Sequence, residues 1–107
     1  MPHVTFVKKI LANGELCQKC FEVSDRLDKD GTLDLINYIA IAEENNPDSE
    51  GIQLAEKYQV ARAPFFVVEE DDGSVQTFDI YFKFKRYMQK NGYLVQNTGV
   101  TELRKTG

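Results

Sequence analysis

The chain of 107 residues has the length of one small domain, and its apolar share of 42% and charged share of 28% are typical of soluble globular proteins. Its net charge of −4 excludes nucleic acid as the expected partner, because phosphate binding needs concentrated lysine and arginine. No apolar run approaches the roughly 20 residues that cross a bilayer. The first residues also lack the order of a secretory signal, so we expect a cytoplasmic protein with no membrane partner.

The chain opens with a predicted strand, loop and helix. Residues 4–10 alternate and are rich in β-formers, which predicts a strand. The turn dipeptide Asn13-Gly14 marks the loop that follows. In residues 17–29 the apolar side chains recur at helical spacing, and Gly31 stands where a glycine commonly ends a helix.

The middle of the chain predicts a second strand and helix. Residues 35–42 are nearly all apolar, which suits a central strand covered on both faces. Asn46 offers a capping side chain, and Pro47 follows it at the first helical position. We therefore expect a helix to begin here and to run to about Tyr58.

The last elements are two short strands and a helix. An apolar strand is predicted at residues 65–68, and the Asp-Gly dipeptide within residues 71–74 predicts a hairpin turn into a strand at residues 75–81. A helix follows at residues 82–90. Residues 91–107 are short on apolar side chains, and we expect a loosely docked tail.

The element order is therefore β-α-β-α-β-β-α, an α/β fold. A strand, helix and strand in succession demand a right-handed parallel crossover, and the closing hairpin supplies an antiparallel pair. The sequence thus predicts a four-stranded mixed sheet with helices on both faces.

The segment Cys17-Gln18-Lys19-Cys20 contains both cysteines of the chain and lies where the first loop meets the first helix. The attacking species in disulfide exchange is the thiolate, which the unpaired N–H groups and macrodipole of a helix start stabilise. A thiol three residues on is close enough to expel a mixed disulfide. This placement predicts Cys17 as the nucleophile and Cys20 as the buried resolving thiol, with Lys19 adding positive potential.

Two other interpretations of the cysteine pair stay open. Free cysteine is commonly buried, so both thiols could be reduced core residues. A metal shared across a dimer is the second alternative. Within one chain no metal site is expected, because tetrahedral zinc needs four ligands, His3 is the only histidine and no second C-x-x-C exists. No cofactor is expected either.

The β-α-β-α-β-β-α order, with the C-x-x-C at the start of the first helix and Ala63-Pro64 at the start of the third strand, resembles the thioredoxin/glutaredoxin superfamily. The resemblance covers about residues 4–90, so residues 1–90 are expected to form a thioredoxin-like domain ahead of the tail at 91–107. Gln18-Lys19 replaces the Gly-Pro of thioredoxins and the Pro-Tyr of typical glutaredoxins. The chain is interpreted as a divergent, glutaredoxin-like member.

The resemblance implies further site residues. In that superfamily the proline is cis and lies against the C-x-x-C, and the residue before it offers backbone hydrogen bonds to a bound partner. Carried over, Pro64 is the cis-proline, Ala63 the docking residue and Arg62 a residue that shapes the groove. Together with Lys19 these residues are the expected substrate-binding set.

The function implied by this resemblance is that of a thiol-disulfide oxidoreductase acting on a protein disulfide or a small-molecule disulfide. An unidentified reductant restores the dithiol, and the protein is expected to be a monomer. The main rival is a binding module or thiol sensor, in which the cysteine pair regulates docking without turnover. A metal-holding dimer is the third possibility.

Overall fold

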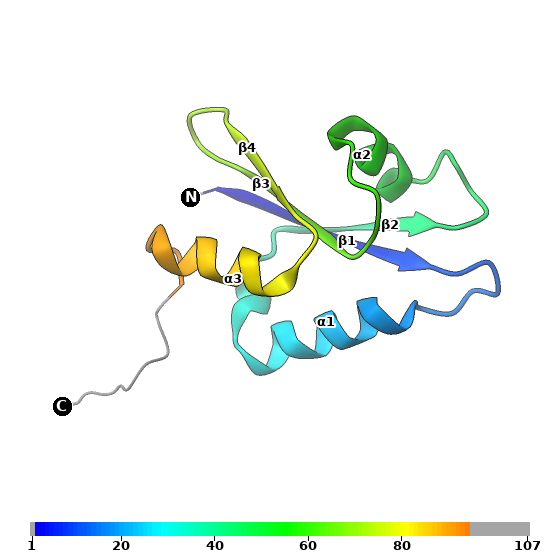
Figure 1. Ribbon diagram of the computed structural model, residues 1–107, viewed down its shortest axis with the longest axis horizontal. Helices are drawn as coiled ribbons and strands as arrows, with labels where there is room; N and C mark the ends of the chain where they lie inside the picture. The colour runs from blue at the N-terminus through cyan, green and yellow to red at the C-terminus, as the bar shows by residue number, and fades with distance from the viewer. Residues whose placement is uncertain (1, 95–107) are drawn as a thin grey trace.

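The computed structural model describes residues 2–94, so most of the predicted tail lies outside the described residues. The element order is the predicted one (Figure 1): β1 (His3–Ile10), α1 (Gln18–Lys29), a short 3-10 helix η1 (Thr32–Leu35), β2 (Tyr38–Glu43), α2 (Glu50–Tyr58), β3 (Phe65–Glu69), β4 (Val75–Phe78) and α3 (Tyr81–Lys90). No helix among the described residues is long and apolar enough to span a bilayer.

The four strands form one mixed sheet, in the order β2-β1-β3-β4. β1 and β2 run parallel, as the crossover through α1 requires. β3 is antiparallel to β1, and the hairpin turn pairs β3 with β4 antiparallel. Gly73 of this turn has a φ of 91°, a conformation that glycine adopts without steric cost. The predicted four-stranded mixed sheet is confirmed.

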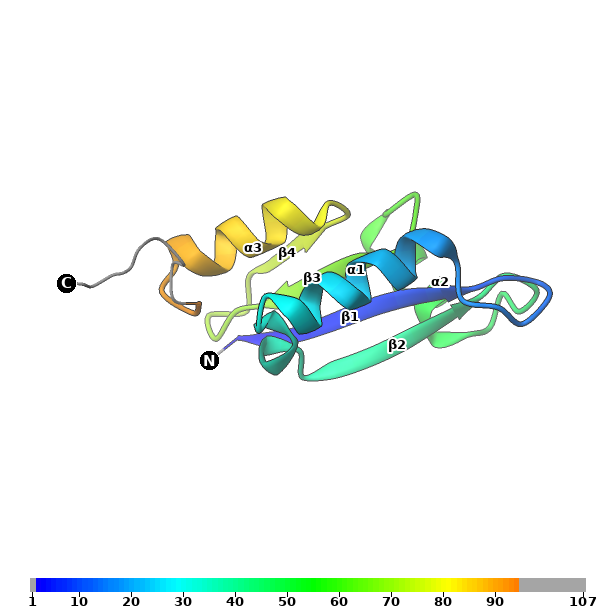
Figure 2. The same cartoon turned by 90° about the horizontal axis from the view of Figure 1, so that it is seen from below.

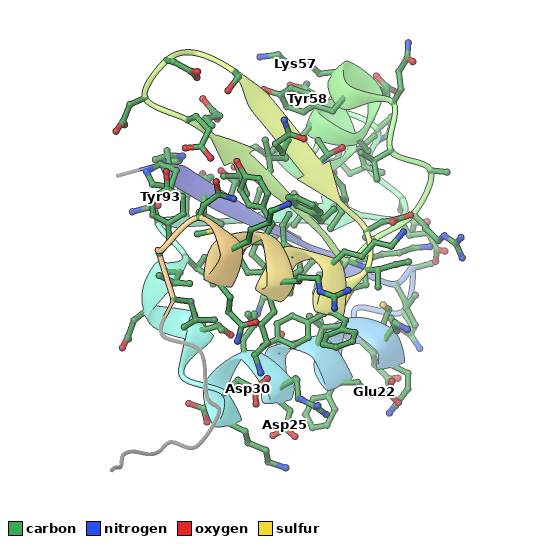
Figure 3. All side chains as sticks on the ribbon, turned by 60° about the vertical axis from the view of Figure 1, so that its left-hand side comes forward. Glu22, Asp25, Asp30, Lys57, Tyr58 and Tyr93 are labelled. Atoms are coloured by element: carbon green, nitrogen blue, oxygen red, sulfur yellow. The ribbon has the colours of Figure 1, made fainter. Side chains whose placement is uncertain are left out.

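One face of the sheet is covered by α1 and α3 (Figures 1 and 2). The centre of this core is an aromatic stack in which Phe66 of β3 lies between Phe6 of β1 and Phe84 of α3. Its ring centroid is 4.8 Å from that of Phe6 and 4.0 Å from that of Phe84. Figure 3 shows α3 lying across this face, with α1 beside it. The buried partners complete the layer: Val4, Val23, Leu27, Val68 and Met88.

The other face of the sheet is covered by α2, so helices lie on both faces as predicted. Side chains alternate along β3, so one strand contributes to both cores. Phe65 and Val67 point to α2, whereas Phe66 and Val68 point to α1 and α3. Gly51 is buried in the first turn of α2 and touches β2. A Cβ built on Gly51 would lie 2.4 Å from the backbone nitrogen of Ala42.

Replacing Gly51 with alanine is therefore expected to destabilise the fold, although alanine is the better helix former by about 1 kcal/mol. The added methyl group meets backbone rather than a movable side chain, and overpacking of this kind costs about 1–3 kcal/mol. Urea unfolding of Gly51→Ala measures the loss. The control is Glu56→Ala on the exposed side of the same helix, which we expect to change stability by less than about 0.5 kcal/mol. A Gly51→Ala chain as stable as the parent would contradict the close packing.

The predicted strand at residues 35–42 is wrong at its start, because β2 begins only at Tyr38. Residues Thr32–Leu35 form the 3-10 helix instead, and its end is closed by a hydrogen bond from the Ile36 N–H to the Leu33 carbonyl. The buried Thr32 hydroxyl ties this turn to α1 by donating to the Leu27 carbonyl. Apolar composition alone does not distinguish a buried turn from a strand.

Two helix starts also differ from the prediction. Asn46-Pro47 does not begin a helix; α2 begins at Glu50 after Ser49, and the Ser49 hydroxyl accepts from the Glu43 N–H rather than from α2. The strand predicted at 75–81 ends at Phe78, since Ile80 accepts the first hydrogen bonds of α3. The Gly31 prediction is confirmed, with a φ of 73° just past α1.

The first residues after α3 fold back onto the domain. The Tyr93 hydroxyl donates to Glu70 at 2.8 Å, and Leu94 packs against the core under α3. Residues 95–107 lie outside the described residues.

Candidate redox site

The end of β1 fixes the position of Cys17. Leu16 forms an isolated bridge with Ile10, and the Cys17 N–H donates to the Lys9 carbonyl at 3.1 Å. The loop between them turns at Gly14, whose φ is 87°. The chain thus leaves β1, turns, and returns to the same strand end before α1 begins.

Glu44 holds this loop from the neighbouring strand. Its carboxylate accepts from the Ala12 N–H at 2.8 Å and pairs with the Lys9 ammonium at 3.4 Å. The Ala12 hydrogen bond and then the Lys9 contact lower the pKa of Glu44. Acidic residues in a charged stretch such as this one are usually solvated surface, and the sequence pattern gives no sign of another role. The role of Glu44 escapes sequence reasoning because the contact joins residues 32 positions apart.

Cys17 is the N-cap of α1, as the predicted helix start implied. Its backbone is extended, and its sulfur accepts from the Cys20 N–H at 3.3 Å, the role that a serine or aspartate oxygen usually fills. The Cys17 and Cys20 sulfurs are 2.9 Å apart, and both cysteines are free. One thiol is partly exposed and the other is buried one turn inside the helix, so the two differ in their access to solvent.

Cys20 lies in the first turn of α1, and its side chain is fully buried against β1. Its sulfur accepts from the Lys9 N–H at 3.1 Å, so Lys9 contacts the backbone of one cysteine and the sulfur of the other. Burial and the contact with Cys17 raise the pKa of Cys20 to about 12, against opposing effects of the Lys9 N–H and the Lys8 charge. At neutral pH the Cys20 thiol therefore keeps its proton.

Pro64 lies at the same end of the sheet. The Ala63-Pro64 peptide bond is cis, as the resemblance implied, and Pro64 is buried. The register pairs Phe65 with Val7, so β3 begins where β1 ends. The two features that the sequence singled out therefore meet at one end of the molecule.

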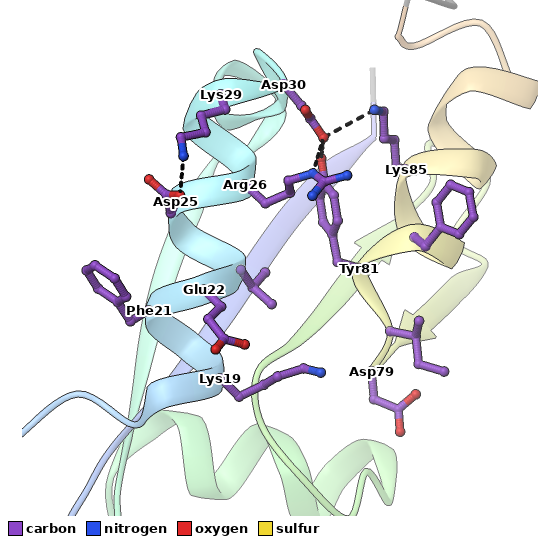
Figure 4. A pocket seen from close by; sticks show the side chains of 13 residues that line it. Lys19, Phe21, Glu22, Asp25, Arg26, Lys29, Asp30, Asp79, Tyr81 and Lys85 are labelled. Carbon is purple, nitrogen blue, oxygen red and sulfur yellow. Dashed lines mark hydrogen bonds and ion pairs between the residues drawn. The ribbon is translucent and has the colours of Figure 1, made fainter.

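A groove of about 500 Å³ lies between α1 and the start of α3. Lys19 lines it near the cysteines and extends toward Asp79 (Figure 4). Ile80 and Phe82 give the groove exposed apolar surface on the α3 side. Phe21 also contributes to the lining, with its ring on the side of α1 away from α3 (Figure 4). The groove offers a charged mouth next to the dithiol and an apolar wall beyond it.

The far end of the groove is closed by the carboxylate of Asp30. It accepts from the Tyr81 hydroxyl at 2.7 Å, from the Lys85 ammonium at 3.1 Å and from Arg26 at 3.3 Å (Figure 4). The Tyr81 hydrogen bond, followed by the contacts with Lys85 and Arg26, lowers the pKa of Asp30 below its ordinary value despite opposing desolvation. This cluster joins the end of α1 to α3 and sets the spacing of the groove walls.

Arg62 and Ala63 lie on the opposite face, where they line a smaller hollow of about 180 Å³ together with Lys9. Arg62 is 82% exposed and forms an ion pair with Asp79 at 3.7 Å. Because Asp79 also lines the groove beside Lys19, this ion pair lies between the two hollows. The four predicted binding residues therefore do not share one pocket: Lys19 lines the groove, Arg62 and Ala63 line the smaller hollow, and Pro64 lines neither.

Within residues 2–94 no group of three or more histidine, cysteine, aspartate or glutamate side chains could hold a metal ion. The groups that the structure places at this end of the sheet are two thiols, the backbone of Lys9 and the charges of Lys19, Arg62 and Asp79.

No protein-family model matches the chain, and no curated protein matches it. Solved structures do. A thioredoxin from Fasciola hepatica superposes with a TM-score of 0.50 and 16% identity, over 82% of this chain and 80% of that one. Thioredoxin f2 from Chlamydomonas reinhardtii gives a TM-score of 0.50 and 12% identity, over 88% of this chain and 83% of that one. The chain therefore has a thioredoxin-like fold.

Proposed function

We propose that the protein is a thiol-disulfide oxidoreductase that reduces disulfides with Cys17 as nucleophile and Cys20 as resolving thiol. The observation that carries this proposal is the unequal pair: a partly exposed sulfur at the N-cap of α1, 2.9 Å from a fully buried sulfur whose pKa is raised to about 12. A thiol-redox role also fits the thioredoxin-like fold.

The reaction balances as two exchanges. The Cys17 thiolate attacks one sulfur of a substrate disulfide, which forms a mixed disulfide and releases the first substrate thiolate. Cys20 then loses its proton and attacks the Cys17 sulfur. The second substrate thiolate leaves and takes up a proton from solvent, where the Cys20 proton went. The Cys17–Cys20 dithiol has thereby given two electrons to the substrate and become a disulfide. An external thiol reductant returns these electrons.

Substrate recognition is proposed to use the backbone at Ala63 and the charges of Lys19 and Arg62. Lys19 lies on one face of the sheet and Arg62 and Ala63 lie on the other. A bound disulfide that reached both faces would cross the end of the sheet above Cys17. The proposal places the protein in the cytoplasm, where thiols are kept reduced, and as a monomer. Membership of a glutaredoxin-like subgroup stays a prediction.

A redox titration read by thiol alkylation and intact mass tests the proposal. We expect Cys17 and Cys20 to close reversibly as a two-electron couple between about −300 and −180 mV, a span that includes thioredoxins, glutaredoxins and protein disulfide isomerase. We also expect repeated turnover of a small aromatic disulfide in the presence of excess reductant. An internal disulfide that forms without catalytic cycling would favour a thiol sensor instead. If no internal disulfide forms, the redox proposal is wrong.

A further inference from the structure

β2 is an edge strand whose outer side has no strand partner within the described residues. Tyr38 is 46% exposed and Ile39 is 42% exposed, so the first two side chains of β2 offer apolar surface to solvent, whereas Ala40 and Ala42 are buried. Natural edges are usually protected by lysine, proline, a bulge or short length. The segment from Tyr38 to Ala42 contains neither proline nor charge.

The other edge of the sheet shows the contrast. β4 has four residues against six in β2, and two of the four are the polar Gln76 and Thr77. A short and polar edge is the protected kind. The unprotected edge is therefore specific to β2.

The surroundings of β2 are acidic. From Asp30 to Glu56 the chain has seven acidic residues and no lysine, arginine or histidine. Among the described residues only two of the seven, Asp30 and Glu44, form ion pairs. The Tyr38 hydroxyl donates to the Glu50 carboxylate at 2.6 Å, which places that charge beside the start of β2, and Glu43 is exposed at its end.

The cations nearest to β2 in the sheet lie one strand further in. The register places Lys8 beside Ile41 and Lys9 beside Ala42, and Lys9 is already paired with Glu44. A second copy of this chain would bring acidic strand ends against acidic strand ends, which costs electrostatic energy. A segment carrying positive charge would meet complementary charge at both ends.

We propose that the outer edge of β2 binds an extended, basic segment of a partner protein, which adds to the sheet as a fifth strand. Main-chain hydrogen bonds supply the affinity, contacts with Tyr38 and Ile39 select apolar side chains, and the acidic ends select lysine or arginine. Because β2 is parallel to β1, its carboxyl end lies at the end of the sheet that carries Cys17. The docked segment therefore leads toward the dithiol, although its binding does not depend on thiol exchange.

The test uses the full chain with both cysteines changed to serine, which removes thiol exchange, and a cysteine-free peptide of about ten residues that alternates lysine and valine. We expect the amide signals of residues 38–43 to shift in NMR spectra. The amides of residues 38–42 that point away from β1 should become protected from hydrogen exchange, whereas the others already bond to β1. Ile39→Lys should weaken binding about tenfold. The matched control is Val75→Lys on β4, at a position 38% exposed, which should leave affinity within about twofold.

Several results would overturn this inference. Equal binding of a peptide that alternates glutamate and valine would remove the role of charge. Shifts confined to β4 or to the α1–α3 groove would place the site elsewhere. Protection of the amides that point away from β1, in residues 38–42, before peptide is added would show that another segment of the chain or a second copy already covers the edge, and sedimentation would distinguish those two.

Discussion

Cys17→Ser is expected to reduce the rate of disulfide exchange to less than about one-thousandth of the parent rate. The remaining thiol, Cys20, is buried, and with a pKa of about 12 only about one molecule in 100,000 carries its thiolate at pH 7. The fold should survive, since serine is a favoured N-cap residue and its oxygen can accept from the Cys20 N–H. Release of the coloured thiolate from an aromatic disulfide measures the rate.

Cys20→Ser is expected to give the opposite result. Cys17 still attacks, so one equivalent of coloured thiolate is released, but nothing displaces the second half of the probe. Intact mass should show a stable mixed disulfide on Cys17, whereas the parent releases two equivalents and closes its internal disulfide. Cys20→Ala is the second variant, because it tests whether the serine hydroxyl matters. Equal behaviour of the Cys17 and Cys20 variants would contradict the assigned roles.

Much of the local structure could be predicted from sequence because it depends on neighbours in the chain. Alternation in residues 4–10 and helical spacing in 17–29 placed β1 and α1 within a residue or two. The helix-start position of Cys17 followed from the same spacing. The cis bond at Pro64 came from the family resemblance, since composition alone favours a trans bond.

The rest depends on contacts between distant segments. Nothing near Glu44 in the sequence shows that its carboxylate holds the loop before Cys17. The Asp30 cluster that spaces α1 from α3 joins residues more than 50 positions apart. From the sequence alone Gly51 is a weak helix former, and only the structure shows that it packs against the backbone of β2. In each case the sequence gives the residue, and only the tertiary structure shows which residue it contacts.

The stability of the reduced protein is expected to fall at alkaline pH because of Cys20. Its thiol has a pKa of about 12 in the folded chain, against an ordinary value of 9.0 in the unfolded chain. Between these values the folded state holds the proton that the unfolded state has lost, so the stabilisation is complete below about pH 9 and declines as pH rises toward 12. The expected slope is about 1.4 kcal/mol per pH unit for one proton.

Urea unfolding of the reduced chain at a series of pH values from about 8 to 11 measures this slope. Cys20→Ala is the reference, because tyrosines and lysines titrate alike in both proteins and cancel in the difference. Cys17→Ala should retain most of the slope, since burial is the largest cause of the raised pKa and contact with Cys17 comes second. Identical slopes for the parent and Cys20→Ala would show that the buried thiol ionises as readily as in the unfolded chain. The distinction between an attacking and a resolving cysteine would then lose its electrostatic basis.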